Sequence, residues 1–197
     1  MGAVGGADVH SGYSGNEEWD WNGAHGTQDD TPEKRLKPGA NAAGEPGFVV
    51  SSAGTTAVWA DENTREGIWN AMRSKEAYGT SGTLIRLRFF GGWDLPKGIT
   101  RDKEFVKKAY AAGVPMGQDM PPHPAKDLAK APSFAVWALK DPESGNLDRI
   151  QIVKVWPNPA TGYPMEKIYE VAWGDAEKRK LDSTTGKLPH VGNTVDV

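Results

Sequence analysis

The chain contains no cysteine. Disulfide bonds, thiolate nucleophiles and cysteine-ligated metal or iron–sulfur sites are therefore excluded for these 197 residues. The 23 lysines and arginines nearly balance the 26 acidic residues, and they form no basic run typical of binding to a phosphate backbone. We therefore expect no nucleic-acid partner.

Long apolar runs are also missing. No stretch approaches the roughly 20 residues that a membrane-spanning helix needs, so we expect a soluble chain without a membrane partner. The N-terminus, MGAVGGAD, lacks the basic and apolar regions of a signal peptide, which indicates a cytoplasmic protein if Met1 is the true start. The sequence also lacks a Gly-x-Ser-x-Gly elbow, a Walker loop, a dinucleotide-binding fingerprint and a His-Glu-x-x-His helix. Serine-nucleophile chemistry and nucleotide cofactors are therefore unsupported.

Glycine, proline and tryptophan are abundant instead. The 24 glycines and 14 prolines favour turns and long loops over a helical bundle. Eight tryptophans are many for this length. They can pack between sheet layers, or some of them can form an aromatic platform for a ligand, and the sequence leaves both interpretations open.

The pattern along the chain predicts strands and short helices. Residues 2–8 are small and can form a buried strand that ends on Asp8, and residues 11–47 resemble one long loop. Asn63 and Glu66 form a capping box that predicts a helix ending near Tyr78-Gly79. The alternation after it gives a strand with one apolar face and one face carrying Arg86 and Arg88. Further predicted elements are a helix over 100–112 and strands over 133–139, 149–156 and 167–173, which favour a small antiparallel sheet or sandwich.

The hexapeptide Gly6-Ala7-Asp8-Val9-His10-Ser11 carries the clearest chemical signal. Residues two apart in an extended backbone point to the same side, so Asp8 and His10 can offer a carboxylate oxygen and an imidazole nitrogen to one metal ion. Mixed oxygen and nitrogen ligands suit Zn, Mn or Fe. An Asp and a His that are simply hydrogen-bonded within a loop would give the same spacing.

This hexapeptide is similar to a late metal-binding motif of the polymerase-and-histidinol-phosphatase (PHP) superfamily of hydrolases. Nearly the whole chain resembles one bacterial branch of that superfamily, the domain-of-unknown-function family 3604, which is akin to carbaryl-hydrolase-like enzymes. The stretches that carry the resemblance are VWADENTRE (58–66), YGTSG (78–82), RFFGGWD (88–94), GVPMG (113–117), WALKDP (137–142) and SGNLDRIQIVK (144–154).

The resemblance implies an α+β chain in which residues 1–82 form the C-terminal end of a metal-hydrolase α/β barrel, as a strand, a long loop and a helix. Residues 83–197 would form a strand-rich accessory domain, with a small antiparallel sheet or sandwich and a short helix near 101–112. The implied activity is hydrolysis of small-molecule phosphoesters or carboxylic esters by a metal-activated water. Asp8 and His10 would be metal ligands, and His25 would face the active site.

Family members carry further metal-binding motifs, among them His-x-His and Thr-Asp-His, in a long region before the part matched here. The only histidines in this chain besides His10 are His25, His123 and His190. Because a metal site needs about three or four protein ligands, we expect the site to be incomplete unless loop residues or a second copy contribute. The alternative is a non-catalytic accessory or association module, and we expect self-association through exposed apolar surface.

The remaining polar candidates each have an ordinary structural explanation as well. His25 and the acidic pair Glu17 and Glu18 can serve the site or be solvated loop residues. Arg65 can bind an anion or lie on the surface. Tyr78, Thr80 and Ser81 are predicted to make either local turn hydrogen bonds or substrate contacts. The sequence assigns no role to His123 or His190.

Overall fold

A computed structural model describes residues 2–6, 54–127 and 129–195. The chain forms two compact units, Met1–Leu139 and Lys140–Val197. Residues 82 and 83, where the sequence predicts a boundary, both belong to the first unit. In the described part of the chain, no helix is long and apolar enough to cross a membrane.

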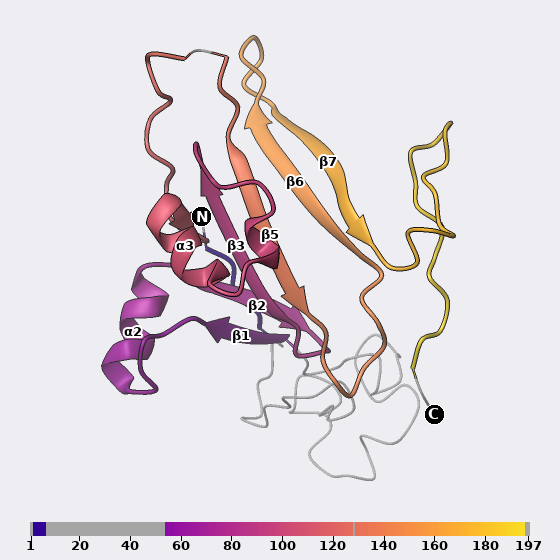
Figure 1. Cartoon of the computed structure of the whole chain (residues 1–197), viewed down its shortest axis with the longest axis horizontal. Helices are drawn as coiled ribbons and strands as arrows, with labels where there is room; N and C mark the ends of the chain where they lie inside the picture. The colour runs from indigo at the N-terminus through magenta and orange to yellow at the C-terminus, as the bar shows by residue number, and fades with distance from the viewer. Residues whose placement is uncertain (1, 7–53, 128, 196–197) are drawn as a thin grey trace, which may run out of the picture. The chain divides into compact units, whose positions relative to one another are not determined.

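The first unit contains a two-stranded antiparallel sheet and a helix between its strands (Figure 1). Strand β1 (Gly54–Val58) pairs with β2 (Ala77–Ser81), and helix α2 (Arg65–Arg73) connects them. Thr56 lies directly opposite Gly79 in the ladder. Cross-strand partners share a face of the sheet, so Thr56 and Gly79 lie on the same face.

Helix α2 is shorter than the sequence predicted. Its N-cap is Thr64, whose hydroxyl accepts a hydrogen bond from the Gly67 N–H at 3.1 Å, rather than Asn63. After the C-cap Ser74, Lys75 adopts a left-handed conformation with φ 62°. The Lys75 and Glu76 N–H groups then bond to the carbonyls of Met72 and Ala71, which is a Schellman motif. The chain therefore turns at residue 75, and Tyr78-Gly79 belongs to strand β2 instead of to a helix end.

The first unit also contains a three-stranded antiparallel sheet. Its order is β4 (Val114–Pro115), β3 (Arg86–Gly92) and β5 (Ser133–Leu139). The predicted helix over 100–112 is divided into a 3₁₀ turn, η2 (Ile99–Arg101), and helix α3 (Phe105–Ala112). Asp102 ends the turn in extended conformation, and its carboxylate accepts the Glu104 N–H at 2.8 Å.

The core of this unit lies on the face of the three-stranded sheet that carries the arginines. Phe90 is only 1% exposed, and the rings of Phe105 and Tyr110 from α3 pack edge-on against it at centroid distances of 5.6 and 5.0 Å. Ile99, Ala109 and Ala135 complete the buried cluster, with Leu95 and Trp137 packed against it. Because Arg88 and Phe90 are two residues apart, Arg88 lies at the edge of this core and not on a purely solvated face.

The second unit contains one hairpin. Strand β6 (Arg149–Pro157) pairs antiparallel with β7 (Pro164–Trp173), with a register shift at Ile150/Gln151. The three C-terminal strands predicted from the sequence are therefore present, but they do not form one sheet. Ser133–Leu139 pairs with β3 in the first unit, and the hairpin forms a sheet of its own.

The predicted end of an α/β barrel is wrong for the described residues. Residues 2–6 form no strand, and the sheets are small and antiparallel, with only two α-helices in the described part. A barrel of that class needs parallel strands joined by helical crossovers. Here the chain passes through α2 and returns antiparallel to β1, so the connection does not extend a parallel sheet. The described residues form small antiparallel sheets with two α-helices.

Candidate functional site

The predicted metal ligands Asp8 and His10 and the predicted catalytic residue His25 lie outside the described residues, as do Glu17 and Glu18. Among the residues that the structure describes, no group of three or more His, Asp or Glu side chains can hold a metal ion. The described part of the chain nevertheless contains residues 2–6, the segment that leads directly to Asp8.

Residues 2–6 lie against the β1–β2 sheet. The Thr56 hydroxyl accepts a hydrogen bond from the Gly5 N–H at 3.1 Å and donates one to the Gly5 carbonyl at 2.8 Å. One side chain thus satisfies both backbone groups of Gly5, as a neighbouring strand would. The segment is therefore attached to β1 at Gly5, which precedes Asp8 by three residues in the sequence.

The contact between this segment and the sheet is backbone against backbone. A Cβ atom added to Gly5 would lie 2.3 Å from the Thr55 carbonyl oxygen, and one added to Gly54 would lie 2.3 Å from that of Gly6. A Cβ on Gly79 would lie 2.7 Å from the Gly5 nitrogen. These separations are far below van der Waals contact, so all three positions require glycine for the chains to approach this closely. A Cβ added to Gly6, by contrast, would meet no atom of the described residues within 4 Å.

Three further candidates from the sequence, Tyr78, Thr80 and Ser81, contact other residues of the fold. Tyr78 is buried in β2, with its ring centroid 6.4 Å from that of Trp59, and the Thr80 hydroxyl donates to the Thr55 carbonyl at 3.5 Å. Ser81 is paired with Gly54 in the sheet. None of the three caps a helix. Arg65 is the exposed first residue of α2.

His123 fixes a loop. Its Nδ1 lies 3.0 Å from the Pro124 carbonyl oxygen and its Nε2 lies 2.9 Å from that of Lys130. Its ring packs edge-on against Trp93, at 4.7 Å between centroids. His190 is exposed in the second unit. Because both His123 nitrogens face backbone carbonyls, neither is directed at a ligand.

A charged cluster that the sequence did not predict lies at the edge of the core of the first unit. The Arg88 guanidinium lies over the Trp59 ring, 3.6 Å from its centroid, and its Nη1 donates to the Tyr110 hydroxyl at 3.2 Å. The Tyr110 hydroxyl in turn donates to Glu76, whose Oε1 is also 3.8 Å from Arg88 Nη1. The side chains of Arg88 and Glu76 are only 16% and 13% exposed. The alternation of β3 pointed to Arg88 as a polar-face residue, but only the fold brings it to Trp59, Glu76 and Tyr110.

The cluster changes the acidity of Tyr110. Burial, followed by the hydrogen bond to Glu76 and the negative charge of that carboxylate, raises the pKa of Tyr110 to about 12, against the opposing effect of Arg88. The phenol is therefore a hydrogen-bond donor at neutral pH, unsuited to act as a base.

Next to this cluster is a hollow of about 680 Å³ that is lined partly by Trp59, Arg88 and Trp137 and partly by residues 100 and 102–107. Arg88 and Trp137 are cross-strand partners on β3 and β5. Two of the cations here have acidic partners, since Arg88 contacts Glu76 and Lys107 lies 3.5 Å from Glu104. The hollow can accept an apolar or aromatic group against the indole rings.

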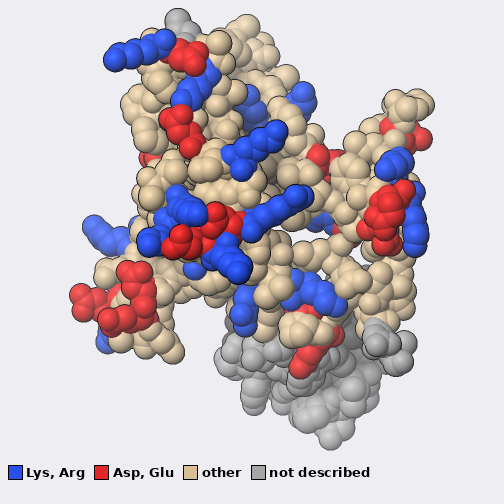
Figure 2. Space-filling model, viewed as in Figure 1, with Lys and Arg blue, Asp and Glu red and all other residues tan. Residues whose placement is uncertain are grey.

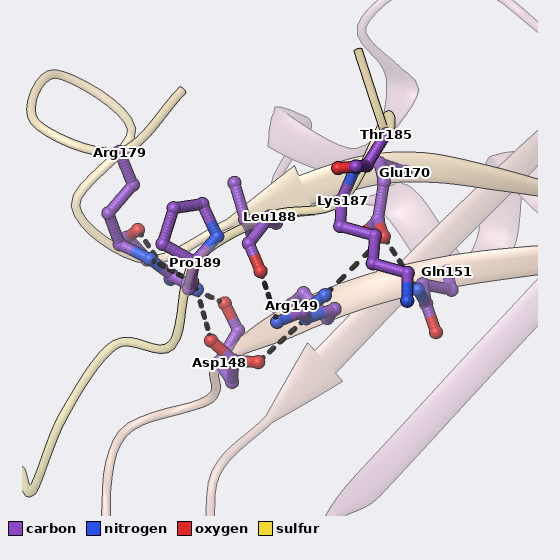
Figure 3. A network of polar contacts seen from close by, with 10 residues as sticks. Asp148, Arg149, Gln151, Glu170, Arg179, Thr185, Lys187, Leu188 and Pro189 are labelled. Carbon is purple, nitrogen blue, oxygen red and sulfur yellow. Dashed lines mark hydrogen bonds and ion pairs between the residues drawn. The ribbon is translucent and has the colours of Figure 1, made fainter. Parts of the chain in front are cut away.

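In the second unit a buried arginine organises the loops around the hairpin (Figure 3). Arg179 is 8% exposed. Its Nη1 donates to the carbonyls of Asp148 and Gly174 at 3.1 and 3.0 Å, its Nε donates to that of Pro189 at 3.0 Å, and its Nη2 donates to the Asp148 carboxylate and to the Pro189 carbonyl. Arg149 Nε binds the other Asp148 oxygen at 2.6 Å. Every donor of Arg179 is directed at the protein, so this network is structural.

Asp148 is acidic for the same reason. Burial alone would raise its pKa, but hydrogen bonds and charge from Arg149 and Arg179 outweigh burial and hold the pKa below its ordinary value of 3.8. Arg149 also lies 3.5 Å from Glu170, which accepts a hydrogen bond from the Gln151 amide at 2.6 Å. The network thus joins the start of β6 to β7 and to the C-terminal loops.

The family model described as "Protein of unknown function (DUF3604)" matches residues 1–197. No curated protein and no solved structure matches the chain at a significant level.

Proposed function

This chain belongs to the DUF3604 family of proteins of unknown function, and we propose that it is part of a metal-dependent hydrolase that acts on small-molecule phosphoesters or carboxylic esters. The observation that carries the proposal is the Asp8-Val9-His10 motif within a chain matched by that family over its whole length. Its similarity to the late motif of PHP-superfamily and carbaryl-hydrolase-like enzymes supports the reaction class.

The donor set fits a divalent metal of the Zn, Mn or Fe type. A carboxylate oxygen and an imidazole nitrogen two residues apart are the mixed ligands that these ions accept. A bound metal of this kind would supply Lewis acidity and a water of lowered pKa. Asp8 and His10 would hold it, and His25 would contact the substrate or transfer a proton. Asp8 and His10 are two of the three or four protein ligands that such a site uses, so further ligands must come from elsewhere.

The test is the metal content of the untagged protein, measured by elemental mass spectrometry in the wild type and in the double variant Asp8→Ala/His10→Ala. We expect Zn, Mn or Fe in the wild type and its loss in the double variant. His190→Ala, at an exposed site in the second unit, is the control and should retain the metal. Equal metal content in the wild type and the double variant would contradict the assignment. A screen of phosphoesters and carboxylic esters with the metal-loaded protein then separates the two substrate classes.

A second candidate function, an association module, is favoured by the surface of α2. Trp69 is 62% exposed and Met72 50% exposed, and with Ile68 they line an apolar hollow of about 670 Å³. Figure 2 shows acidic side chains gathered over this helix, and Glu66 and Arg73 lie one at each end of it. An antiparallel pair of α2 helices from two copies would bring unlike charges together around the apolar residues, so we propose self-association through this face.

Sedimentation velocity over a range of concentrations tests the second candidate. Trp69→Lys should shift the protein toward the monomer, because it places a charge in the apolar contact. Lys107→Glu, on the exposed side of α3, should leave the distribution unchanged. A wild-type protein that is monomeric at all concentrations would remove this candidate and leave the hydrolase proposal untouched.

A further inference from the structure

The hollow beside Trp59 and Arg88 is built from side chains of the first unit. Trp59 follows β1, and Trp137 lies on β5 as the cross-strand partner of Arg88. The rest of the lining comes from Thr100 and residues 102–107. Its volume of about 680 Å³ falls within the range of about 300–1,000 Å³ that is typical of small-molecule sites. Because all of these residues belong to one compact unit, the hollow is a feature of that unit by itself.

Both indole rings at the hollow are held in place by the fold. The Trp59 indole N–H donates to the Leu87 carbonyl at 2.8 Å, and the Arg88 guanidinium covers one face of this ring. Trp137 is half-buried and packs against the core cluster that contains Phe90. A flat ligand would therefore meet aromatic surfaces that are already ordered, so less entropy is lost when it binds.

The charged groups around the hollow do not balance. Three acid–base pairs line or adjoin it: Asp102 with Lys108 at 2.6 Å, Glu104 with Lys107 at 3.5 Å, and Glu76 with Arg88 at 3.8 Å. Lys103 also lines the hollow, and in the described part of the chain it forms no ion pair. The hollow therefore carries a positive charge that its own carboxylates do not neutralise.

We propose that this hollow binds a small aromatic carboxylate, with the ring against the Trp59 and Trp137 indoles and the carboxylate at Lys103 and Arg88. Aromatic rings pack favourably on indole, either stacked or edge-on. A guanidinium has five N–H donors suited to a carboxylate, and in the described residues only the bond to Tyr110 uses one. A neutral ring would leave Lys103 without a counter-charge, and an aliphatic acid would lose the ring contacts. This inference does not rest on the proposed hydrolase function.

The experiment is a titration of the full chain with naphthoate, followed by the indole N–H signals in a nitrogen–proton correlation spectrum. Each signal is assigned from a Trp→Phe variant. We expect the signals of Trp59 and Trp137 to move with a common saturation curve. The signal of Trp93, whose indole N–H donates to the Pro121 carbonyl and which does not line the hollow, should stay in place.

Two analogues of the probe separate the two parts of the ligand. Naphthamide keeps the ring and removes the charge, whereas decalin carboxylate keeps the charge and removes the aromatic ring. Each should bind at least about 3-fold more weakly than naphthoate. Equal binding of naphthoate and naphthamide would overturn the role of the charge, and with it the inference.

The matched variants are Lys103→Gln and Lys97→Gln, which remove the same charge inside and outside the hollow. Lys97 is exposed and does not line it. We expect Lys103→Gln to raise the naphthoate dissociation constant about 3-fold to 5-fold, to leave that of naphthamide unchanged, and Lys97→Gln to bind like the wild type. Trp137→Leu should weaken both ligands about 5-fold, and Trp137→Phe, which keeps a ring in the core, should weaken them less. Denaturant unfolding shows that each variant is folded.

Three results would overturn the inference. The first is the absence of shifts at Trp59 and Trp137 at millimolar naphthoate, as expected if another part of the chain fills the hollow. The second is an equal loss of affinity in Lys103→Gln and Lys97→Gln, which would show attraction by overall charge only. The third is loss of naphthoate binding in Asp8→Ala/His10→Ala, which would place the carboxylate on a metal and leave the hydrolase proposal standing. Naphthoate binding that persists in that double variant supports the hollow, whatever the metal content of the wild type.

Discussion

The Arg88 guanidinium lies over the indole ring of Trp59, 3.6 Å from the ring centroid. The indole N–H of Trp59 donates to the Leu87 carbonyl at 2.8 Å. The backbone of β3 therefore fixes the ring on which the next residue of that strand, Arg88, is stacked. A planar cation on an aromatic face, little exposed to water, is more stabilising than the same pair on an open surface. This contact joins the end of β1 to the three-stranded sheet.

Replacing Arg88 by lysine should lower the free energy of unfolding by about 1–2 kcal/mol, because an ammonium group cannot stack on the ring and also reach Tyr110. Denaturant unfolding provides the measurement. Arg86→Lys, two residues earlier on the same strand and exposed, should change it by about 0.5 kcal/mol or less. Equal effects of the two substitutions would show that the stack contributes nothing specific.

Tyr110 should remain protonated at pH values where an ordinary tyrosine ionises. Its pKa is raised to about 12 from 10.0, so its un-ionised form is favoured in the folded protein. The stability that it contributes is therefore complete below pH 10 and is lost as the pH rises toward 12. Ultraviolet titration of tyrosinate should show one late-ionising group that is missing in Tyr110→Phe. An unchanged titration curve in that variant would refute the assignment.

Asp148 should make the second unit sensitive to acid. Burial opposes ionisation, but Arg149 and Arg179 hold its pKa below 3.8 in the folded chain. The stability from Asp148 is thus present above its unfolded pKa and is lost as the pH falls through the lower folded value. Asp148→Asn should flatten this acid dependence of the β6–β7 hairpin, followed by circular dichroism. Glu177→Gln, at an exposed position of the same unit, should leave the dependence as it is.

Arg179→Lys should destabilise the second unit by about 3 kcal/mol, since lysine leaves buried carbonyl groups and the Asp148 carboxylate without donors. Amide hydrogen exchange of β6 and β7 measures the loss directly. Exposed Lys178→Ala, one residue earlier, is the control. If protection of the hairpin is the same in Arg179→Lys and in the control, the network of Figure 3 does not hold the hairpin.

Lys75→Gly should stabilise the first unit by about 1 kcal/mol, because glycine adopts the left-handed conformation required after α2 without the steric cost that lysine bears. The φ angle of Lys75 is 62°. Lys107→Gly, at the third of the eight residues of α3, should have the opposite effect, a loss of up to about 1 kcal/mol, because that position is helical. Thermal unfolding of both variants distinguishes a local backbone effect from a general effect of removing lysine.

The sequence alone determined the elements whose signal is local. The strand 133–139 was predicted with its observed bounds, and the strands at 149–156 and 167–173 were found to within a few residues, because β-branched and aromatic residues between turns specify extended backbone by themselves. Sequence stretches spread along the chain also predicted the DUF3604 family, and the match of the family model over residues 1–197 confirms that family. The reaction, the metal and the roles of Asp8, His10 and His25 remain predictions.

The tertiary structure decided where helix α2 ends, which strands pair and which distant residues come into contact. The helix after Asn63 ended early because Lys75 took a left-handed conformation and residues 77–81 found a partner in β1, which no propensity signals. The partner of β5 was β3 and not its neighbour in sequence, because burial of Phe90 and Ala135 on one face selects that pairing. Nothing in the sequence distinguishes Thr56. Its hydrogen bonds to the backbone of Gly5, 51 positions away, exist only in the folded chain. Strand pairing and close backbone contacts involve residues far apart in the chain. Local sequence patterns therefore cannot predict them, and only the folded structure shows which residues interact.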